Sequence, residues 1–584
     1  YILQNMILKK TQTIAIVGAG PRGLAALEAL CLEMQDAQIQ IKVLVFEPSA
    51  YPGAGQIWSP AQVETNLSNI HERHLANGLS GRPQIQVGSV VLPAFESYKD
   101  WAKVPENPNA EVPDVFPSRA KLGSYLHERF ETLKNALQGA GLLEMHKRAM
   151  VDISIAAKSC TLKDDVGTTY KADEVVLTIG HQPTAFSEQL ALWDAHAKAN
   201  NLKLYKDPYP VGALETETIT PETTVALRGF GLSMVDQMRA LSIGFGGSFN
   251  EIEGTDRFQF TPSAKAPKEL IAFSLDGLPP APKPKNPKID SWFEPSETEM
   301  LQFKEAINSA RQNPEAHNDA SFLIRALGKM TAAVYLRLGD KARPTNLSEH
   351  ELAELTEKLL RRPKEIQHEL ILSHKLPAID ALNALLDMAC GRAAISLDYC
   401  LGQCWRFALG VLYHEFTHFE FNDATMVDLV KYIEASKRYS YGPPIASVQQ
   451  LIALVEAGVL NLDFVDNPTI ELVPEGWELH KNKKSAVADV MVNSVIDPPQ
   501  LVKVTSDLVE NLVADKKVNA VSYKLGLHTL EDGRIISEAG NTHQPIALLG
   551  RLAKGSVIGV DDLIECFGKP ASKWAEGVVN RLKA

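Results

Sequence analysis

Three closely spaced glycines, Gly18, Gly20 and Gly23, follow a short apolar run at residues 14–17 and precede an apolar helix pattern at residues 24–32. This is G-x-G-x-x-G in the strand–turn–helix setting in which the motif binds dinucleotides. The first glycine permits the tight turn, the second lets the backbone approach a pyrophosphate, and the third lets the helix pack closely on the strand. The free N–H groups at the helix N-terminus attract the phosphates.

A second apolar run, residues 41–46, ends in Glu47. A carboxylate at the end of the second strand of such a unit accepts hydrogen bonds from ribose hydroxyls. Together with the glycine turn, this acid predicts a dinucleotide site. The alternative is a glycine-rich turn in an unrelated α/β fold, because bare G-x-G-x-x-G matches are common.

A second glycine turn lies further along the chain. Residues 224–228 have the composition of a strand, and Gly229, Gly231 and Ser233 then open an apolar helix pattern. Two dinucleotide units in one chain serve a simple purpose, since one can hold a flavin and the other a nicotinamide so that hydride passes between them.

Polar side chains are dense between residues 63 and 81, next to the first unit. Asn66, His71 and Arg73 are the candidates for residues that face the substrate and the flavin. The alternative is a solvated loop.

A competing motif, H-E-x-x-H, occurs at residues 414–418. On a helix, His414 and His418 would share a face and could bind zinc, with Glu415 as the general base of a metallohydrolase. The chain lacks the downstream H-x-x-G-x-x-H that would supply a third ligand, and the surrounding residues resemble a packed helix, so we expect no metal here.

Composition limits the class of protein. The 584 residues carry a formal net charge of −12, which argues against nucleic-acid and anionic-membrane partners. The sequence contains no run of 18 or more apolar residues, so no membrane span is predicted. The six cysteines form no C-x-x-C pair, which removes a local dithiol mechanism and predicts reduced thiols in a cytoplasmic protein.

The periodicity of the remaining chain predicts further elements. Strands are expected in 149–162, 173–180 and 546–550, helices in 118–137, 446–458 and much of 296–460, and a helix start in 556–564. A proline-rich segment, residues 279–287, predicts a semi-rigid linker or a loop over the active site.

The predicted fold is therefore α/β, with two Rossmann-like dinucleotide-binding domains and a large helical insertion. The expected boundaries are 1–220 for the first part of the FAD domain, 221–290 for the NAD(P) core, 291–490 for the helical region and 491–584 for the last part of the FAD domain. The helical region could shape the substrate pocket, or it could serve packing or a homo-oligomer interface.

Several segments, taken in order, resemble the two-dinucleotide-binding flavoproteins allied to flavin-dependent N-hydroxylating monooxygenases. They are IVGAGPRGL, FEPSAYPGAGQIW, ETNLSN, FPSRAKLGSYL, VVLTIGH, LRGFGLSMVDQM, YGPP and ALLGRLAKGSVIGVDDL. The resemblance implies a set of FAD-binding residues, namely Gly18, Gly20, Pro21, Arg22, Gly23, Glu47, Gly55, Trp58, Asn66, Leu67, Arg119, Gly180, Gly550 and Asp561. It implies that Gly229, Gly231 and Ser233 hold the phosphates of the nicotinamide cofactor.

The resemblance also implies an activity. The expected enzyme uses FAD and NAD(P)H, adds O2 at the C4a carbon of the flavin, and passes oxygen from the hydroperoxide to the nitrogen of an amine or amino acid. The alternative is a flavin-dependent reductase without oxygen insertion. A 2′-phosphate needs a basic clamp, and Arg257, Lys265 and Lys268 are the candidates. The family's glycine-arginine pair is replaced here by Ser263-Ala264-Lys265, so NADPH is favoured while NADH stays open.

Overall fold

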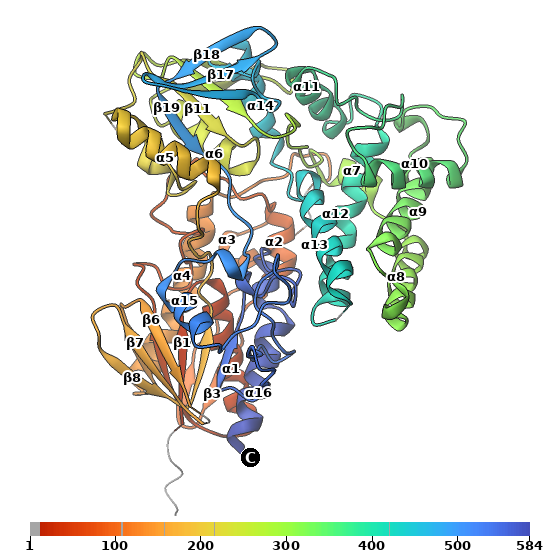
Figure 1. The fold of residues 1–584 in the computed structure, drawn as a ribbon. Helices are drawn as coiled ribbons and strands as arrows, with labels where there is room; N and C mark the ends of the chain where they lie inside the picture. Colours follow the sequence, from red (N-terminus) through yellow and green to blue (C-terminus); the bar gives the residue numbers. More distant parts are fainter. Residues whose placement is uncertain (1–11, 107–108, 157, 215–216, 420, 584) are drawn as a thin grey trace, which may run out of the picture.

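The computed structural model describes residues 12–106, 109–156, 158–214, 217–419 and 421–583. Figure 1 shows two regions that contain sheets, one above the other, and a mostly helical region to one side. This arrangement has the two dinucleotide-binding domains and the helical region that the sequence predicts, so the predicted fold class is confirmed.

The first sheet has five parallel strands in the order β20-β9-β1-β2-β5. Its strands are β1 (Gln12–Val17), β2 (Ile41–Phe46), β5 (Leu143–His146), β9 (Glu174–Leu177) and β20 (Ile546–Leu548). Their apolar composition follows from burial on both faces. Helices α1 (Pro21–Ala37), α4 (Arg119–Gly139) and α16 (Lys569–Lys583) share a core with one face, and the antiparallel strands β6 (Met150–Ile155), β7 (Cys160–Asp164) and β8 (Thr169–Ala172) share a core with the other.

The C-terminal part of the chain returns to this first sheet. Strand β20 pairs with β9, and α16 lies beside α1 (Figure 1). Arg581 of α16 donates to both carboxylate oxygens of Glu174 in β9, at 2.7 Å each. The N-terminal glycine turn and the C-terminal segment are therefore parts of one structural unit.

The second sheet repeats the plan of the first. Its order is β10-β19-β11-β14-β15, again parallel, with β10 (Lys203–Tyr205), β11 (Thr224–Arg228), β14 (Glu269–Phe273), β15 (Leu460–Asn461) and β19 (Val490–Asn493). An antiparallel meander, β16 (Thr469–Val473), β17 (Gly476–Lys481) and β18 (Lys484–Ala488), precedes β19 just as β6–β8 precede β9. Three of the five strands come from outside the expected core of residues 221–290.

The helical region is inserted between β14 and β15. It contains α7 (Pro287–Asp290), α8 (Glu297–Gln312), α9 (Ser321–Arg337), α10 (Glu349–Arg361), α11 (Ala378–Ala389), α12 (Leu397–Phe416) and α13 (Asp423–Ser440), and α14 (Ile445–Glu456) then leads back to the second sheet. Most of these helices share one apolar core of their own. None of the described helices is both long enough and apolar enough to cross a membrane.

Most of the predicted elements are present. The expected helices 118–137 and 446–458 are confirmed as α4 and α14, and the expected strand 546–550 is confirmed as β20. The helix start expected in 556–564 is wrong, because these residues form turns up to a short 3-10 helix, η7 (Ile564–Phe567). The carbonyls of Gly559 and Val560 accept hydrogen bonds from Arg22, so they are held by a side chain outside the segment.

Candidate functional site

The first glycine turn lies at the carboxyl end of β1, in the middle of the first sheet. Gly18 has φ +93°, and a Cβ on it would lie 2.5 Å from the carbonyl oxygen of Thr178. A Cβ on Gly23 would lie 2.3 Å from the carbonyl oxygen of Gly18. Packing and backbone conformation therefore require glycine at both positions, whatever the turn binds.

Gly20 differs from its two neighbours. It has φ −73° and ψ −165°, which any residue can adopt, and a Cβ there would meet only Gly55, at 3.7 Å. Gly20 is also the N-cap of α1, and no side chain caps this helix. The turn therefore presents free N–H groups next to a space that a Cβ would partly fill, which fits the pyrophosphate of a dinucleotide.

Glu47 stands at the end of β2 beside this turn. Its carboxylate accepts from the backbone N–H of Ala19 at 2.7 Å and of Ser49 at 2.8 Å, and the residue is 7% exposed. A carboxylate offers about four lone-pair sites, so capacity remains for ribose hydroxyls. These bonds hold the acid at the edge of the turn.

The loop after β2 packs on α4. A Cβ on Gly123 of α4 would lie 1.5 Å from the carbonyl oxygen of Trp58, so the helix and the loop meet at a glycine. Asn66 follows and is 1% exposed. Its Nδ2 donates to Gln62 at 3.0 Å, while its Oδ1 has no hydrogen-bond partner among the described residues. A buried amide oxygen without a donor is rare and fits a polar ligand group.

The neighbours of Asn66 continue this wall. Leu67 forms an isolated bridge with Ser118, at the start of α4. Gly180, after β9, has φ +63° and open space where a Cβ would stand. Both positions border the carboxyl edge of the first sheet, where the turn lies.

Arg22 attaches the C-terminal segment to the turn. Its guanidinium donates to the carbonyl of Val560 at 3.0 Å. A Cβ on Gly550 would lie only 2.8 Å from the Cδ of Arg22, so the two residues are closely packed. Asp561 is ion-paired with Arg551 and, at 2.7 Å, with Lys437 of α13. Burial raises the pKa of Asp561, but these cations hold it far below its usual value. Asp561 thus joins the first domain to the helical region.

The second glycine turn lies at the carboxyl end of β11. Gly229 has φ +128°, and Gly231 is the N-cap of α6 (Leu232–Ser242), which no side chain caps. Gly231 has φ −122° and ψ −160°, and a Cβ on it would meet nothing within 4 Å. Ser233 is buried in the first turn of the helix. The features of Gly20 therefore recur at Gly231.

The basic residues considered for a 2′-phosphate do not lie at this turn. Lys265 and Lys268 precede β14, which runs parallel to β11, whereas the turn follows β11. Strands β11 and β14 pair over five residues, so the start of β14 and the turn after β11 lie about 16 Å apart along the strands. Arg257 contacts Asn383 and Asp387 of α11 instead.

A buried polar bridge joins the two domains. Arg119, the first residue of α4, pairs with Asp236 of α6 at 2.7 Å, and both also hydrogen-bond the hydroxyl of Tyr209, at 2.9 and 2.6 Å. Burial alone lowers the pKa of the guanidinium, but Asp236 holds it above its usual value. The bridge holds the start of α4 against α6, the helix that follows the second glycine turn.

His71 and Arg73 lie on the side of the first domain that faces the helical region. His71 caps α2 (Glu72–Gly78) by accepting the N–H of His74 at its Nδ1, at 3.2 Å. Burial and the neighbouring cations hold the pKa of His71 far below its usual value, so the ring is neutral. Arg73 pairs with Asp114 at 2.8 Å and with Asp290 at 2.5 Å. The structure thus brings these candidates together with a set of charged groups.

Sequence reasoning missed three polar residues that lie beside these candidates, Lys283, Gln403 and Arg406. Lys283 lies in the proline-rich segment, and the other two lie on α12. A signal was present in the sequence, since Gln403 and Arg406 are polar residues within an apolar helix pattern. Their neighbours across space could not be read from the chain.

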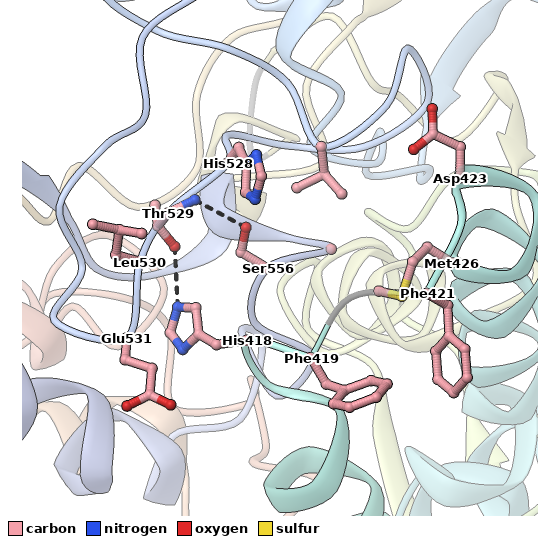
Figure 2. A pocket seen from close by; sticks show the side chains of 12 residues that line it. His418, Phe419, Phe421, Asp423, Met426, His528, Thr529, Leu530, Glu531 and Ser556 are labelled. Carbon is pink, nitrogen blue, oxygen red and sulfur yellow. Dashed lines mark hydrogen bonds between the residues drawn. The ribbon is translucent and has the colours of Figure 1, made fainter. Parts of the chain in front are cut away.

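The H-E-x-x-H segment does not form one helical face. Helix α12 ends at Phe416, and His418 follows with φ +55°. His414 contacts Lys569 at 2.5 Å, and His418 Nε2 lies 3.2 Å from the hydroxyl of Thr529. His418 lines a cavity of about 220 Å³. Figure 2 shows its ring pointing toward Thr529.

Within the described part of the chain, the one cluster with metal-ligand spacing is elsewhere. It consists of Glu471, Glu478 and His480 on the hairpin β16–β17. Exposed acidic groups are common without an ion.

Comparison with known proteins agrees with this geometry. Residues 15–182 match the family of FAD-NAD(P)-binding domains. The chain is 31% identical to a nitrosuccinic acid synthase of Aspergillus oryzae over 53% of its own length and 46% of that protein. It is 30% identical to a nitrosuccinate-forming L-aspartate N-monooxygenase of Streptomyces davaonensis over 48% of its own length and 46% of that protein.

A solved flavin-containing monooxygenase of Stenotrophomonas maltophilia superimposes with a TM-score of 0.38 at 12% identity, covering 98% of this chain and 99% of that one. In the sequence comparisons, by contrast, the chain spans about half the length of the two relatives that it matches. The match to the FAD-NAD(P)-binding family covers residues 15–182, and the chain as a whole, with its two parallel sheets and two glycine turns, resembles the flavin-dependent N-hydroxylating monooxygenases.

Proposed function

We propose that this protein is an FAD-dependent, NAD(P)H- and O2-consuming monooxygenase that oxidises the nitrogen of an amino acid. One observation carries the proposal: two uncapped glycine turns, at Gly20 and Gly231, lie on two sheets that the Arg119–Asp236 ion pair locks together. Two phosphate-binding turns held in one rigid frame serve electron transfer between two nucleotides.

The residues of the first domain fit FAD. The turn at Gly20 and Gly55 would hold the pyrophosphate, Glu47 the ribose, and the unpaired Oδ1 of Asn66 would face a donor on the flavin side. When bound, FAD would supply a hydride acceptor and activate O2. The chain would orient the two cofactors and exclude water from the site, which protects reactive oxygen species from solvent.

L-Aspartate is the first substrate to test. Two relatives with about 30% identity form nitrosuccinate, one of them by name from L-aspartate. The site described above also lies beside a set of partly buried cations, which suits a substrate with carboxylates. The partners that we propose are therefore a small amino acid, O2 and NADPH, with NADH as the competing nucleotide.

The test is coupled turnover by the purified protein. With FAD bound, L-aspartate should raise NADPH consumption, and the N-oxidised product should account for most of it when followed by mass spectrometry. Hydrogen peroxide, measured in parallel, reports oxygen that was reduced without transfer. If neither L-aspartate nor any other amino acid yields an N-oxidised product and all consumed NADPH appears as peroxide, the protein is a reductase or oxidase and the proposal is wrong.

The interdomain ion pair makes a separate prediction. In Arg119→Met, Asp236 loses a buried partner and the two domains lose their fixed orientation, so the rate of flavin reduction by NADPH should fall about tenfold. Although the resemblance implied that Arg119 binds FAD, its guanidinium is engaged by Asp236 and Tyr209, so the FAD content should stay unchanged. Stopped-flow absorbance of the flavin under anaerobic conditions measures this rate. The matched control is Lys121→Met on the same helix, whose partly exposed pair with Glu72 lies within the first domain and should not affect this rate. An unaltered rate in Arg119→Met would show that the pair does not orient the cofactors.

A further inference from the structure

Lys283 is a buried cation without a counter-ion at contact distance. It is 8% exposed, and its Nζ donates to the carbonyl oxygen of Asn69. Among the described residues, no carboxylate lies within ion-pairing distance of its Nζ. Buried charges are normally paired, and an ammonium group has three N–H donors. Lys283 therefore has capacity for an anionic group that the chain itself does not supply.

One face of α12 covers Lys283. The hydroxyl of Tyr399 donates to the carbonyl of Pro282 at 2.9 Å, which places this face against the residue before the lysine. Gln403 follows one turn later and Arg406 a further turn on, so both lie on the same face. The backbone N–H of Lys283 donates to Pro443, after α13, at 3.1 Å. The lysine is thus enclosed by the first domain, α12 and the segment between α13 and α14.

Gln403 provides a buried amide donor without a partner. It is fully buried, and its Oε1 accepts from Arg406 Nε at 3.1 Å. Because a guanidinium only donates, the amide oxygen must face Arg406 and the amide nitrogen must point elsewhere. That nitrogen has no hydrogen-bond partner among the described residues, although buried amide groups are nearly always satisfied.

The ion pairs that the described residues form around these donors involve two arginines but not Lys283. We define the junction cluster as Arg73, Asp114, Lys283, Asp290 and Arg406, at the meeting point of the first domain and the helical region. Arg73 and Arg406 both pair with Asp290, and Arg73 also pairs with Asp114. The carboxylates of Asp114 and Asp290 are thus ion-paired with the two arginines, whereas Lys283 has no ion pair among the described residues and Asp562 acts on it only from a longer distance.

We propose that Lys283 and Gln403, supported by Arg406, bind a carboxylate of the amino-acid substrate, and that this contact gives the enzyme its preference for an acidic amino acid. That the bound carboxylate belongs to the substrate rests on the proposed function. The contact with Asn69, three residues after the FAD-facing Asn66, places this carboxylate site beside the flavin side of the first domain.

The protonation of Lys283 supports this role. Burial, and next the charge of Arg406, lower the pKa of Lys283 to about 7, and Asp290 and Asp562 oppose this shift. The charged groups that face it are Arg406 of α12, Asp290 of α7, Asp562 of the C-terminal segment and Arg73 of α2, while the neighbouring His71 is neutral. The lysine is charged below that pH and neutral above it, so anion binding should weaken as the pH rises through 7 to 9.

Succinate is the probe for this site, because it carries two carboxylates and no nitrogen to oxidise. Calorimetry on the FAD-loaded protein should show succinate binding that weakens by up to tenfold for each pH unit above about 7. Lys283→Met should lower the affinity at pH 6.5 at least 30-fold and remove the pH dependence. Lys283→Arg should retain binding and also lose the pH dependence, since arginine stays charged. Far-UV circular dichroism and FAD content verify that both variants fold.

The matched control is Lys288→Met. Lys288 lies five residues along the same segment, exposed and paired with Glu111, so its loss should leave succinate binding unchanged. If Lys283→Met binds succinate as the unaltered protein does, or if the unaltered protein does not bind it, the proposal is overturned. Binding that depends on Lys283 in a protein that oxidises no amino acid would instead refute the proposed function and keep the carboxylate site.

Discussion

Gly20→Ala should fold normally and lose FAD. The backbone of Gly20, with φ −73°, accepts alanine, and the new Cβ would meet no protein atom closer than 3.7 Å. The methyl group would instead occupy the space beside the uncapped N-terminus of α1, where the pyrophosphate would lie. Displacing a charged phosphate from its N–H donors removes on the order of 3 kcal/mol, about 100-fold in affinity. Flavin absorbance of the purified protein, and titration of the apoprotein with FAD, measure the loss.

The matched control for this change is Gly231→Ala in the second turn. It has the same extended backbone and the same open space, so it should also fold. It should keep FAD at full occupancy and lose affinity for NADPH instead. A Gly20→Ala protein that purifies with one FAD per chain would contradict the placement of the flavin nucleotide at the first turn.

The fold could be predicted from the chain only where the signal was local. The strand–turn–helix units at Gly18 and Gly229 are contiguous in sequence, and both are present in the structure as predicted. The second sheet was harder to predict because β15 and β19 follow the helical region, close to 190 residues after β14 in the case of β15. Short buried strands such as β15 carry almost no periodicity, and only their parallel pairing with β14 identifies them.

The repeated plan of the two sheets explains where the helical region enters. Each sheet is built as strand, helix, strand, a crossover through a helix, a short strand, an antiparallel meander and a further strand. The crossover helix is α4 in the first domain and α14 in the second. The helical region extends this crossover in the second domain alone. Its residues Asp290 and Lys283 thereby reach the side of the first domain that carries Arg73 and Asn69.

The candidate site was predictable to the extent that it depends on backbone. Glycines in the sequence mark tight turns and close backbone contacts, because these places exclude residues with a side chain. The partners of Arg73 and Arg119 could not be foreseen, since Asp290 and Asp236 lie more than 100 residues away from them. Lys265 was considered for the 2′-phosphate because of its charge and because it lies where the family has a glycine-arginine pair, but the direction of β14 places it at the other edge of the sheet.

Glu28→Ala should strongly destabilise the first domain. Glu28 of α1 accepts from Arg82 at 3.1 Å and from Arg129 of α4 at 2.8 and 2.7 Å. All three residues are at most 6% exposed, so the variant would leave two guanidinium groups buried without their counter-ion. Breaking a buried ion pair in this way destabilises by about 3–5 kcal/mol. The expected fall in the thermal midpoint is about 5 °C or more, measured by circular dichroism together with release of FAD fluorescence.

The reason for this large effect is the position of α1. The ion triad ties α1 to α4, and the N-terminus of α1 is the Gly20 turn itself, so loosening the triad should release FAD before the second domain unfolds. Asp36→Ala, an exposed change on the same helix, is the matched control and should stay within about 0.5 kcal/mol of the unaltered protein. Equal midpoints for Glu28→Ala and Asp36→Ala would mean that hydrogen bonds from Arg82 and Arg129 to backbone carbonyls suffice. FAD would then be held by the turn without support from the triad beneath it.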